Sequence, residues 1–115
     1  MRSVEASPAD MIAVDTNVLV RLLTGDDQRQ YEMAYTLFEE EEIFIPRTVI
    51  LEAAGVLRHA YLFYPAQIVA ALTRLAGLPN VTVESARQVA DALRWHADGV
   101  DFVDALHLAA SQHAE

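Results

Sequence analysis

The chain has 115 residues, the size of one domain, with 53% hydrophobic and 22% charged residues, a composition that excludes a disordered protein. It has no cysteine, hence no disulfide framework and no thiolate metal site, and no apolar run approaches the roughly 18 residues of a membrane span. The formal net charge of −9 at pH 7 means that any contact with nucleic acid must be local, through bound cations, a few arginines or a basic partner. We expect a cytoplasmic protein with no membrane contact.

The chain opens with ten residues, MRSVEASPAD, that lack the apolar core of a signal peptide, and we predict a flexible extension there and one domain over residues 11–115. Residues 11–14 are apolar and β-branched, which is typical of a buried strand. Asp15 follows directly, and a helical pattern then runs to residue 23. In an open parallel sheet the crevice lies at the carboxyl ends of the strands, so Asp15 is expected to face a site.

The remaining sequence alternates between helices and strands. We predict strands over residues 43–45 and 81–83, and helices over residues 28–41, 48–63, 66–76, 85–96 and 101–115. Thr24 or Asp26 is the expected cap of the helix over residues 28–41, and Ser85 that of the helix it begins. This order of elements predicts an α/β domain with a short parallel sheet.

Three acids, Asp15, Glu52 and Asp104, sit in segments that are otherwise apolar on nearly all sides. The last helix in particular is hydrophobic almost all round, which predicts that it is buried. A buried carboxylate must be paired, neutralised or bound to a metal. For any single acid an ion pair is a sufficient explanation, and the candidate partners are Arg21, Arg47 and Arg58.

Three carboxylates that converge repel one another strongly, and a divalent cation resolves that repulsion. Ligation by oxygen alone suits Mg²⁺ or Mn²⁺ rather than zinc. Asp101, three residues before Asp104 and on the same helix face, is either a fourth ligand or an N-cap. Asn17 is interpreted as an amide that holds the turn and orients Asp15.

Two arginines, Arg21 and Arg47, are predicted to lie near strand ends. There they either hold phosphates that flank a scissile bond or serve only to solubilise the surface.

With these residues in view, the sequence resembles the PIN-domain ribonucleases, in particular the VapC-like toxin of bacterial toxin–antitoxin pairs. Three motifs carry the resemblance over most of the chain: VDTNVL around Asp15, Pro46-x-Thr48-x3-Glu52, and DFVDALHLAAS around Asp104. The resemblance implies a PIN-like α/β/α sandwich and a Mg²⁺- or Mn²⁺-dependent endoribonuclease site whose metal-binding acids are Asp15, Glu52 and Asp104. It also implies a homodimer inhibited by a cognate antitoxin.

Family members usually continue past the last helix into further strands, the first with a Thr-Phe-Asp-like segment, whereas this sequence stops at residue 115. We therefore expect the last strand or strands of the family, and a late acid, to be missing. Residues 12–14 are then expected at an exposed apolar edge, which is an aggregation hazard. We expect a second copy of the chain or the first ten residues to cover it.

The expected chemistry is metal-assisted hydrolysis of an RNA phosphodiester bond. Asp15 and Asp104 hold a cation that lowers the pKa of a bound water, and Glu52 either bridges to that ion or a second one or accepts the water's proton. RNA as the substrate follows from the resemblance alone. The alternative is a catalytically impaired PIN-like binding module that acts through its antitoxin or dimer surface. An aspartyl phosphatase is disfavoured because residue 17 is Asn and the chain has no lysine.

Overall fold

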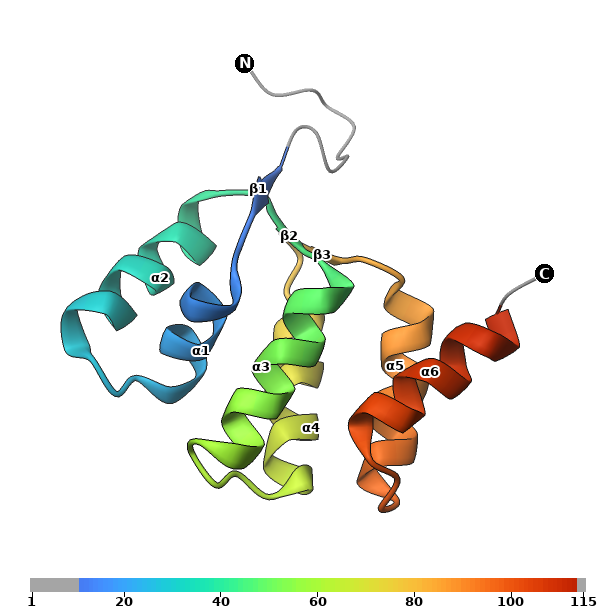
Figure 1. Cartoon of the computed structure of the whole chain (residues 1–115). Coiled ribbons are helices and arrows are strands. Elements are labelled where there is room, and N and C mark those ends of the chain that lie inside the picture. Colours follow the sequence, from blue (N-terminus) through green and yellow to red (C-terminus); the bar gives the residue numbers. More distant parts are fainter. Residues whose placement is uncertain (1–10, 114–115) are drawn as a thin grey trace.

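The structure is a computed structural model of the chain, and it describes residues 11–113. The first ten residues, predicted to form a flexible extension, lie outside the described part. The elements in order are β1 (Ile12–Ala13), α1 (Thr16–Thr24), α2 (Gln28–Glu40), β2 (Ile43–Ile45), α3 (Arg47–His59), α4 (Pro65–Ala76), β3 (Val81–Val83), α5 (Ala86–Ala97) and α6 (Phe102–His113). Figure 1 shows the strands at one end of the molecule and the helices extending from them.

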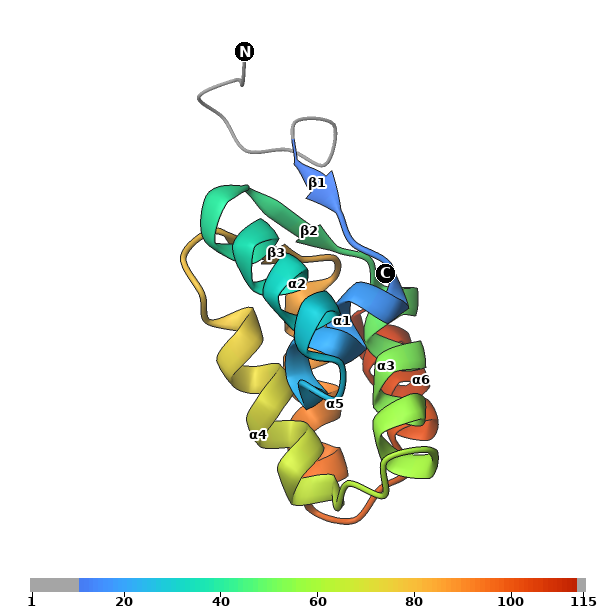
Figure 2. The same cartoon turned by 90° about the vertical axis from the view of Figure 1, so that its left-hand side faces the viewer.

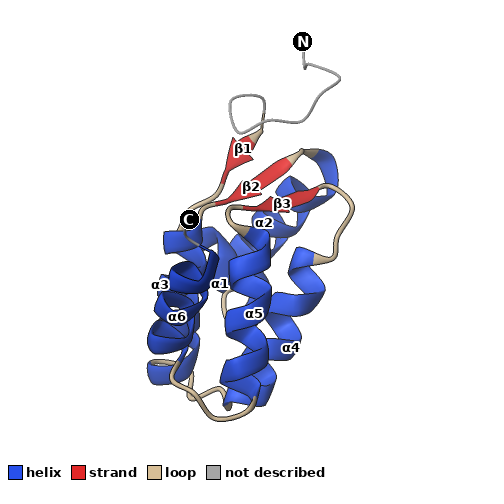
Figure 3. Cartoon of the chain, turned by 90° about the vertical axis from the view of Figure 1, so that its right-hand side faces the viewer, coloured by secondary structure: helices blue, strands red, loops and turns tan. Residues whose placement is uncertain are grey.

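The three strands form one parallel sheet in the order β1-β2-β3. Ile43 of β2 pairs with Ile12 on one side and with Val81 on the other, so β2 is the central strand. The predicted α/β architecture with a short parallel sheet is confirmed. Because the strands are parallel, their carboxyl ends share one edge, and α1, α3 and α5 leave from that edge (Figures 1 and 3).

The core lies between the central strand and the helices. Ile43 and Ile45 of β2 are fully buried, and Pro46 then ends the strand because it has no N–H to continue the ladder. The largest fully buried side chains of the described residues are Leu19, Ile43, Ile45, Ile50, Leu57, Ile68 and Leu72. Each such side chain contributes about 1.5–3 kcal/mol through removal of its surface from water.

Two helix boundaries differ from the predictions because hydrogen bonds outside the regular helix pattern decide where the helix ends or begins. α3 ends at His59, four residues earlier than expected, because Leu62 adopts a left-handed φ of 59° and the Phe63 N–H returns to the Leu57 carbonyl. The cap of α2 is Asp27, whose carboxylate accepts from the Gln30 N–H at 3.0 Å, and so the expectation of Thr24 or Asp26 was wrong.

Ser85 precedes α5 as expected, but its φ is 55° and its side chain makes no capping hydrogen bond. The predicted capping role of Ser85 is therefore wrong.

Strand β1 lies at an edge of the sheet and has no neighbour on its outer side among the described residues. Ile12 is 39% exposed and Ala13 is also exposed, whereas Val14 is buried. The expected apolar edge is thus present at Ile12 and Ala13 but not at Val14. Its predicted covering by a second copy or by the first ten residues stays a prediction. No helix among residues 11–113 has the length and hydropathy needed to cross a bilayer.

Candidate functional site

Asp15 stands at the carboxyl end of β1 and begins α1. Its Oδ1 accepts the Val18 N–H at 2.9 Å, and its carbonyl accepts the Leu19 N–H, so the residue is the N-cap of α1. An N-cap carboxylate also interacts favourably with the helix dipole. Oδ2 has no hydrogen-bond partner within residues 11–113. Asp15 therefore holds the helix start with one oxygen and presents the other to solvent.

Glu52, in the second turn of α3, lies beside the start of α1. The Thr16 hydroxyl donates a hydrogen bond of 2.5 Å to Glu52 Oε1, which joins α1 to α3 directly after Asp15. Acids from two separate sequence motifs thus flank one threonine at the carboxyl edge of the sheet.

Asp15, Glu52, Asp104 and Asp101 are all exposed, so the expectation of buried acids was wrong. The apolar neighbours of Glu52 in the sequence lie on the other face of α3, where Ile50 and Ala53 are buried. α6 is likewise buried on one face only: Val103 is 44% exposed and Leu108 47%. The apolar pattern of α6 therefore does not imply burial on every face, because folded proteins also expose much apolar surface.

Asp104 lies apart from this pair of acids. α6 begins at the end of the helical layer that is far from the sheet, and it packs mainly on α5 (Figures 1 and 2). Asp101 Oδ2 accepts the Asp104 N–H at 3.2 Å, which is the geometry of an N-cap. Within residues 11–113 no three acids or histidines form a group that can hold a metal ion. The structure therefore places Glu52 against Thr16, the residue that follows Asp15, and does not gather Asp15, Glu52 and Asp104 into one group within residues 11–113.

The arginines considered as ion-pair partners of these acids contact other groups instead. Arg21 pairs with Asp26 at 2.9 Å, Arg47 donates to the Gln88 side-chain oxygen at 3.0 Å, and Arg58 donates to the Phe63 carbonyl. Among the described residues none of these arginines contacts Asp15, Glu52 or Asp104, so individual ion pairs do not explain the three acids.

Asp26 is the centre of a polar cluster that ties the α1–α2 loop to the end of α3. Tyr61 donates to its Oδ2 at 2.5 Å, and Arg21 donates to both carboxylate oxygens. The hydrogen bond from Tyr61 lowers the pKa of Asp26 against the opposing effect of burial, and hydrogen bonds from Arg21 and Thr24 lower it further by smaller amounts. The same hydrogen bond raises the pKa of Tyr61.

A groove of about 720 Å³ opens between α1 and α2 and begins at Asp15. Asn17 and Arg21 line its α1 side, as expected for residues near the first acid, and α2 contributes Arg29 and Met33. Sequence reasoning missed these last two residues; their only signal was a spacing of four, which places them on one helix face. Arg47 lies elsewhere, against α5 and the end of β3.

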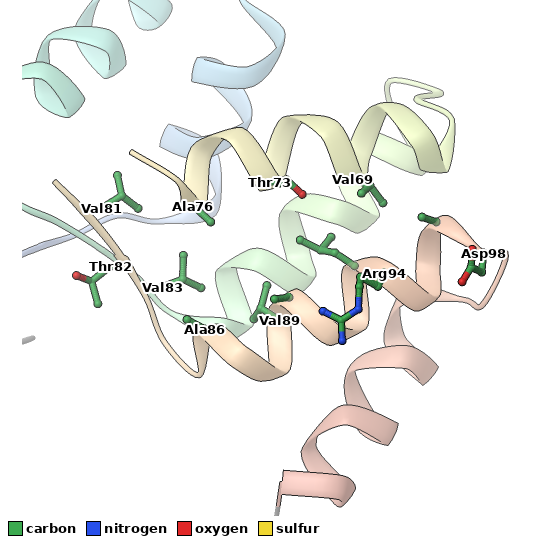
Figure 4. A pocket seen from close by; sticks show the side chains of 13 residues that line it. Val69, Thr73, Ala76, Val81, Thr82, Val83, Ala86, Val89, Arg94 and Asp98 are labelled. Carbon is green, nitrogen blue, oxygen red and sulfur yellow. The ribbon is translucent and has the colours of Figure 1, made fainter. Parts of the chain in front are cut away.

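A second groove of about 770 Å³ lies between α4, β3 and α5 (Figure 4). Valine and alanine side chains form most of its lining, and Arg94, the arginine in it, is paired with Asp91. With Asp98 at one end as its single acid, this groove lacks a set of groups that could act on a substrate.

The fold and the site define a parallel α/β domain with acids at the carboxyl edge of its sheet, an arrangement suited to a hydrolase. The sequence matches the family model described as PIN domain over residues 12–115, and the chain belongs to this family. Membership indicates a nuclease-type hydrolase, a class that generally uses divalent metal ions. No curated protein and no solved structure shows a significant match to the chain.

The candidate ligands of the site have the chemistry that a hard divalent cation requires. Their arrangement meets the geometric requirement only in part. Asp15 and Glu52 offer carboxylate oxygens, which Mg²⁺ and Mn²⁺ prefer. Asp104, the third acid of the predicted set, forms no metal-binding group with them in the described residues, so the geometry of a complete metal site is not formed in this structure.

Proposed function

We propose that the chain is a Mg²⁺- or Mn²⁺-dependent endoribonuclease and the toxin component of a type II toxin–antitoxin system. The observation that supports the proposal is the hydrogen bond from Thr16 to Glu52, since it joins the segment that contains Asp15 to the helix that contains Glu52. We assign metal binding and catalysis to Asp15, Glu52 and Asp104, with Asp101 as an additional candidate ligand. Asp104 and Asp101 are assigned by motif alone.

In this proposal the chain's own residues accept a proton from the attacking water and orient the carboxylate that accepts it. Glu52 has one oxygen held by Thr16 and a second with no hydrogen-bond partner among the described residues, and this second oxygen accepts the proton of the attacking water. Thr16 fixes the direction of that carboxylate. A bound divalent ion would supply a lowered water pKa and neutralise charge on the phosphate.

The partners follow the same proposal. RNA is the substrate, the chain forms a homodimer, and a cognate antitoxin inhibits it in the cytoplasm. The net charge of −9 favours an antitoxin with a basic segment, because a cationic chain complements an acidic surface. Arg21 and Asn17, which line the groove at Asp15, support the substrate there. Arg47 is assigned to a more distant phosphate.

The test is cleavage of single-stranded RNA in Mn²⁺ by the wild type and by Asp15→Asn. Asparagine keeps the helix cap but removes the charge, so the fold is retained and cleavage falls by at least about 100-fold. Asp98→Asn is the matched control, because it also removes one exposed carboxylate charge, lies outside the groove at Asp15 and has no assigned catalytic role. Equal cleavage by wild type and Asp15→Asn would overturn the nuclease and favour the binding module.

A further inference from the structure

The groove between α1 and α2 combines charge and apolar surface next to Asp15. Val18 and Leu37 are half-buried in its floor, and Met33 at its rim is 64% exposed. In such a groove the exposed apolar side chain can contact a flat ring, and the charged groups beside it can contact an ion. Met is suited to such contact because its side chain is flexible and polarisable.

The charges of the groove are not equally available. Arg21 is engaged by Asp26 and Gln30, and Asp27 accepts from the Gln30 N–H. Arg29 is exposed, and its guanidinium makes no hydrogen bond or ion pair with any described residue. It is therefore the cation of this groove that can still receive an anion without losing an existing partner.

We propose that this groove binds the nucleotide that flanks the cleaved phosphodiester, with Arg29 on its phosphate and Met33 against its base. The proposal rests on the proposed function and deepens it, since Asp15 belongs both to the assigned catalytic acids and to the groove. The volume of about 720 Å³ lies within the range of about 300–1,000 Å³ for small-molecule sites, which is ample for one nucleotide. Continuity with Asp15 and the unpaired Arg29 favour an anionic chain over a basic peptide as the occupant.

The test is direct binding of a fluorescein-labelled single-stranded RNA of mixed sequence, measured by anisotropy in Ca²⁺ at a series of increasing salt concentrations, with RNA integrity checked on a denaturing gel. Arg29→Ala should weaken binding by about 5- to 10-fold and reduce the slope of log K against log salt by about 0.7, the value for one phosphate contact on a single strand. Arg29→Lys should restore the slope. Met33→Ala should weaken binding by about 3- to 10-fold and leave the slope unchanged, since packing of the thioether side chain against a base involves no ion release.

Arg74→Ala is the matched control, because Arg74 is exposed on α4, lies outside this groove and has no side-chain partner among the described residues. Equal loss from Arg29→Ala and Arg74→Ala, or no measurable RNA binding by the wild type, would overturn the proposal. If the groove bound another class of partner instead of RNA, one of these two results would be observed. Cleavage of the same RNA by wild type and Asp15→Asn decides the nuclease separately, so RNA binding through Arg29 without cleavage leaves this inference standing and removes only the catalytic assignment.

Discussion

The hydroxyl of Thr16 donates a 2.5 Å hydrogen bond to Oε1 of Glu52, and it does so one residue after the acid that caps α1. The start of α1 is thereby fixed against the second turn of α3. Two motifs that are distant in the sequence meet at this contact, and the position of Glu52 relative to Asp15 depends on it.

Thr16→Val tests the orienting role of that contact. Valine keeps the branched shape and loses the donor, so Glu52 loses its fixed direction, and we expect about a 10-fold loss in RNA cleavage with a higher half-saturating Mn²⁺ concentration. Thr16→Ser retains the hydroxyl and should retain most of the activity. Full activity of Thr16→Val at low Mn²⁺ would show that Glu52 needs no such support.

The two roles of Asp15 can be separated by comparing alanine with asparagine. Asp15→Ala removes the hydrogen bond to the Val18 N–H and should lower the free energy of unfolding by about 0.5–2 kcal/mol, while Asp15→Asn keeps the cap and should cost little. Urea denaturation measures both, and cleavage should be lost in both variants. If Asp15→Ala were as stable as the wild type, the capping role would be refuted.

The Tyr61–Asp26 hydrogen bond predicts a pH dependence of stability. The pKa of Asp26 is lowered in the fold, so its contribution is present above its ordinary pKa of 3.8 and is lost as the pH falls through the folded value. The pKa of Tyr61 is raised, so its contribution is present below 10 and is lost as the pH rises through the folded value.

The corresponding experiment is thermal unfolding of wild type and Tyr61→Phe across this pH range. The Tm of the wild type should exceed that of Tyr61→Phe between about pH 4 and 10, and the difference should shrink at both extremes. A difference that is constant with pH would mean that packing of the ring, rather than the hydrogen bond to Asp26, is responsible.

The outer edge of β1 predicts self-association. The Ile12 N–H donates to the carbonyl of Glu42, just before β2, and the Val14 N–H donates to that of Phe44, so the N–H of the intervening Ala13 faces the open side of this parallel strand. We expect a dimer in size-exclusion chromatography with light scattering. Ala13→Pro removes that outward N–H without touching the bonds to β2, and it should increase the monomer fraction if a second copy pairs there. A wild-type monomer would contradict association through this edge.

Local sequence patterns predicted β2 and β3 at their observed bounds and the α/β class, because short β-branched runs bounded by proline, glycine and asparagine have few other structural solutions. The same patterns wrongly predicted that the acidic side chains are buried. Glu52 is flanked by apolar residues in sequence, yet the helix turns it to the exposed face beside Thr16. The position of Asp104 depends on how the turn at Asp98 and Gly99 directs α6, and this is decided by tertiary packing that no local pattern contains.

Asp15 caps the start of α1 with one carboxylate oxygen and exposes the other to solvent. A single nucleotide change in its codon is enough to produce asparagine. Such a variant would keep its backbone, its surfaces and its affinity for partners while losing its chemistry. For the toxin proposed above, copies of the gene with this change would be harmless and would sequester the same inhibitor as the active form. A survey of natural variants at this position would therefore separate selection on binding from selection on catalysis.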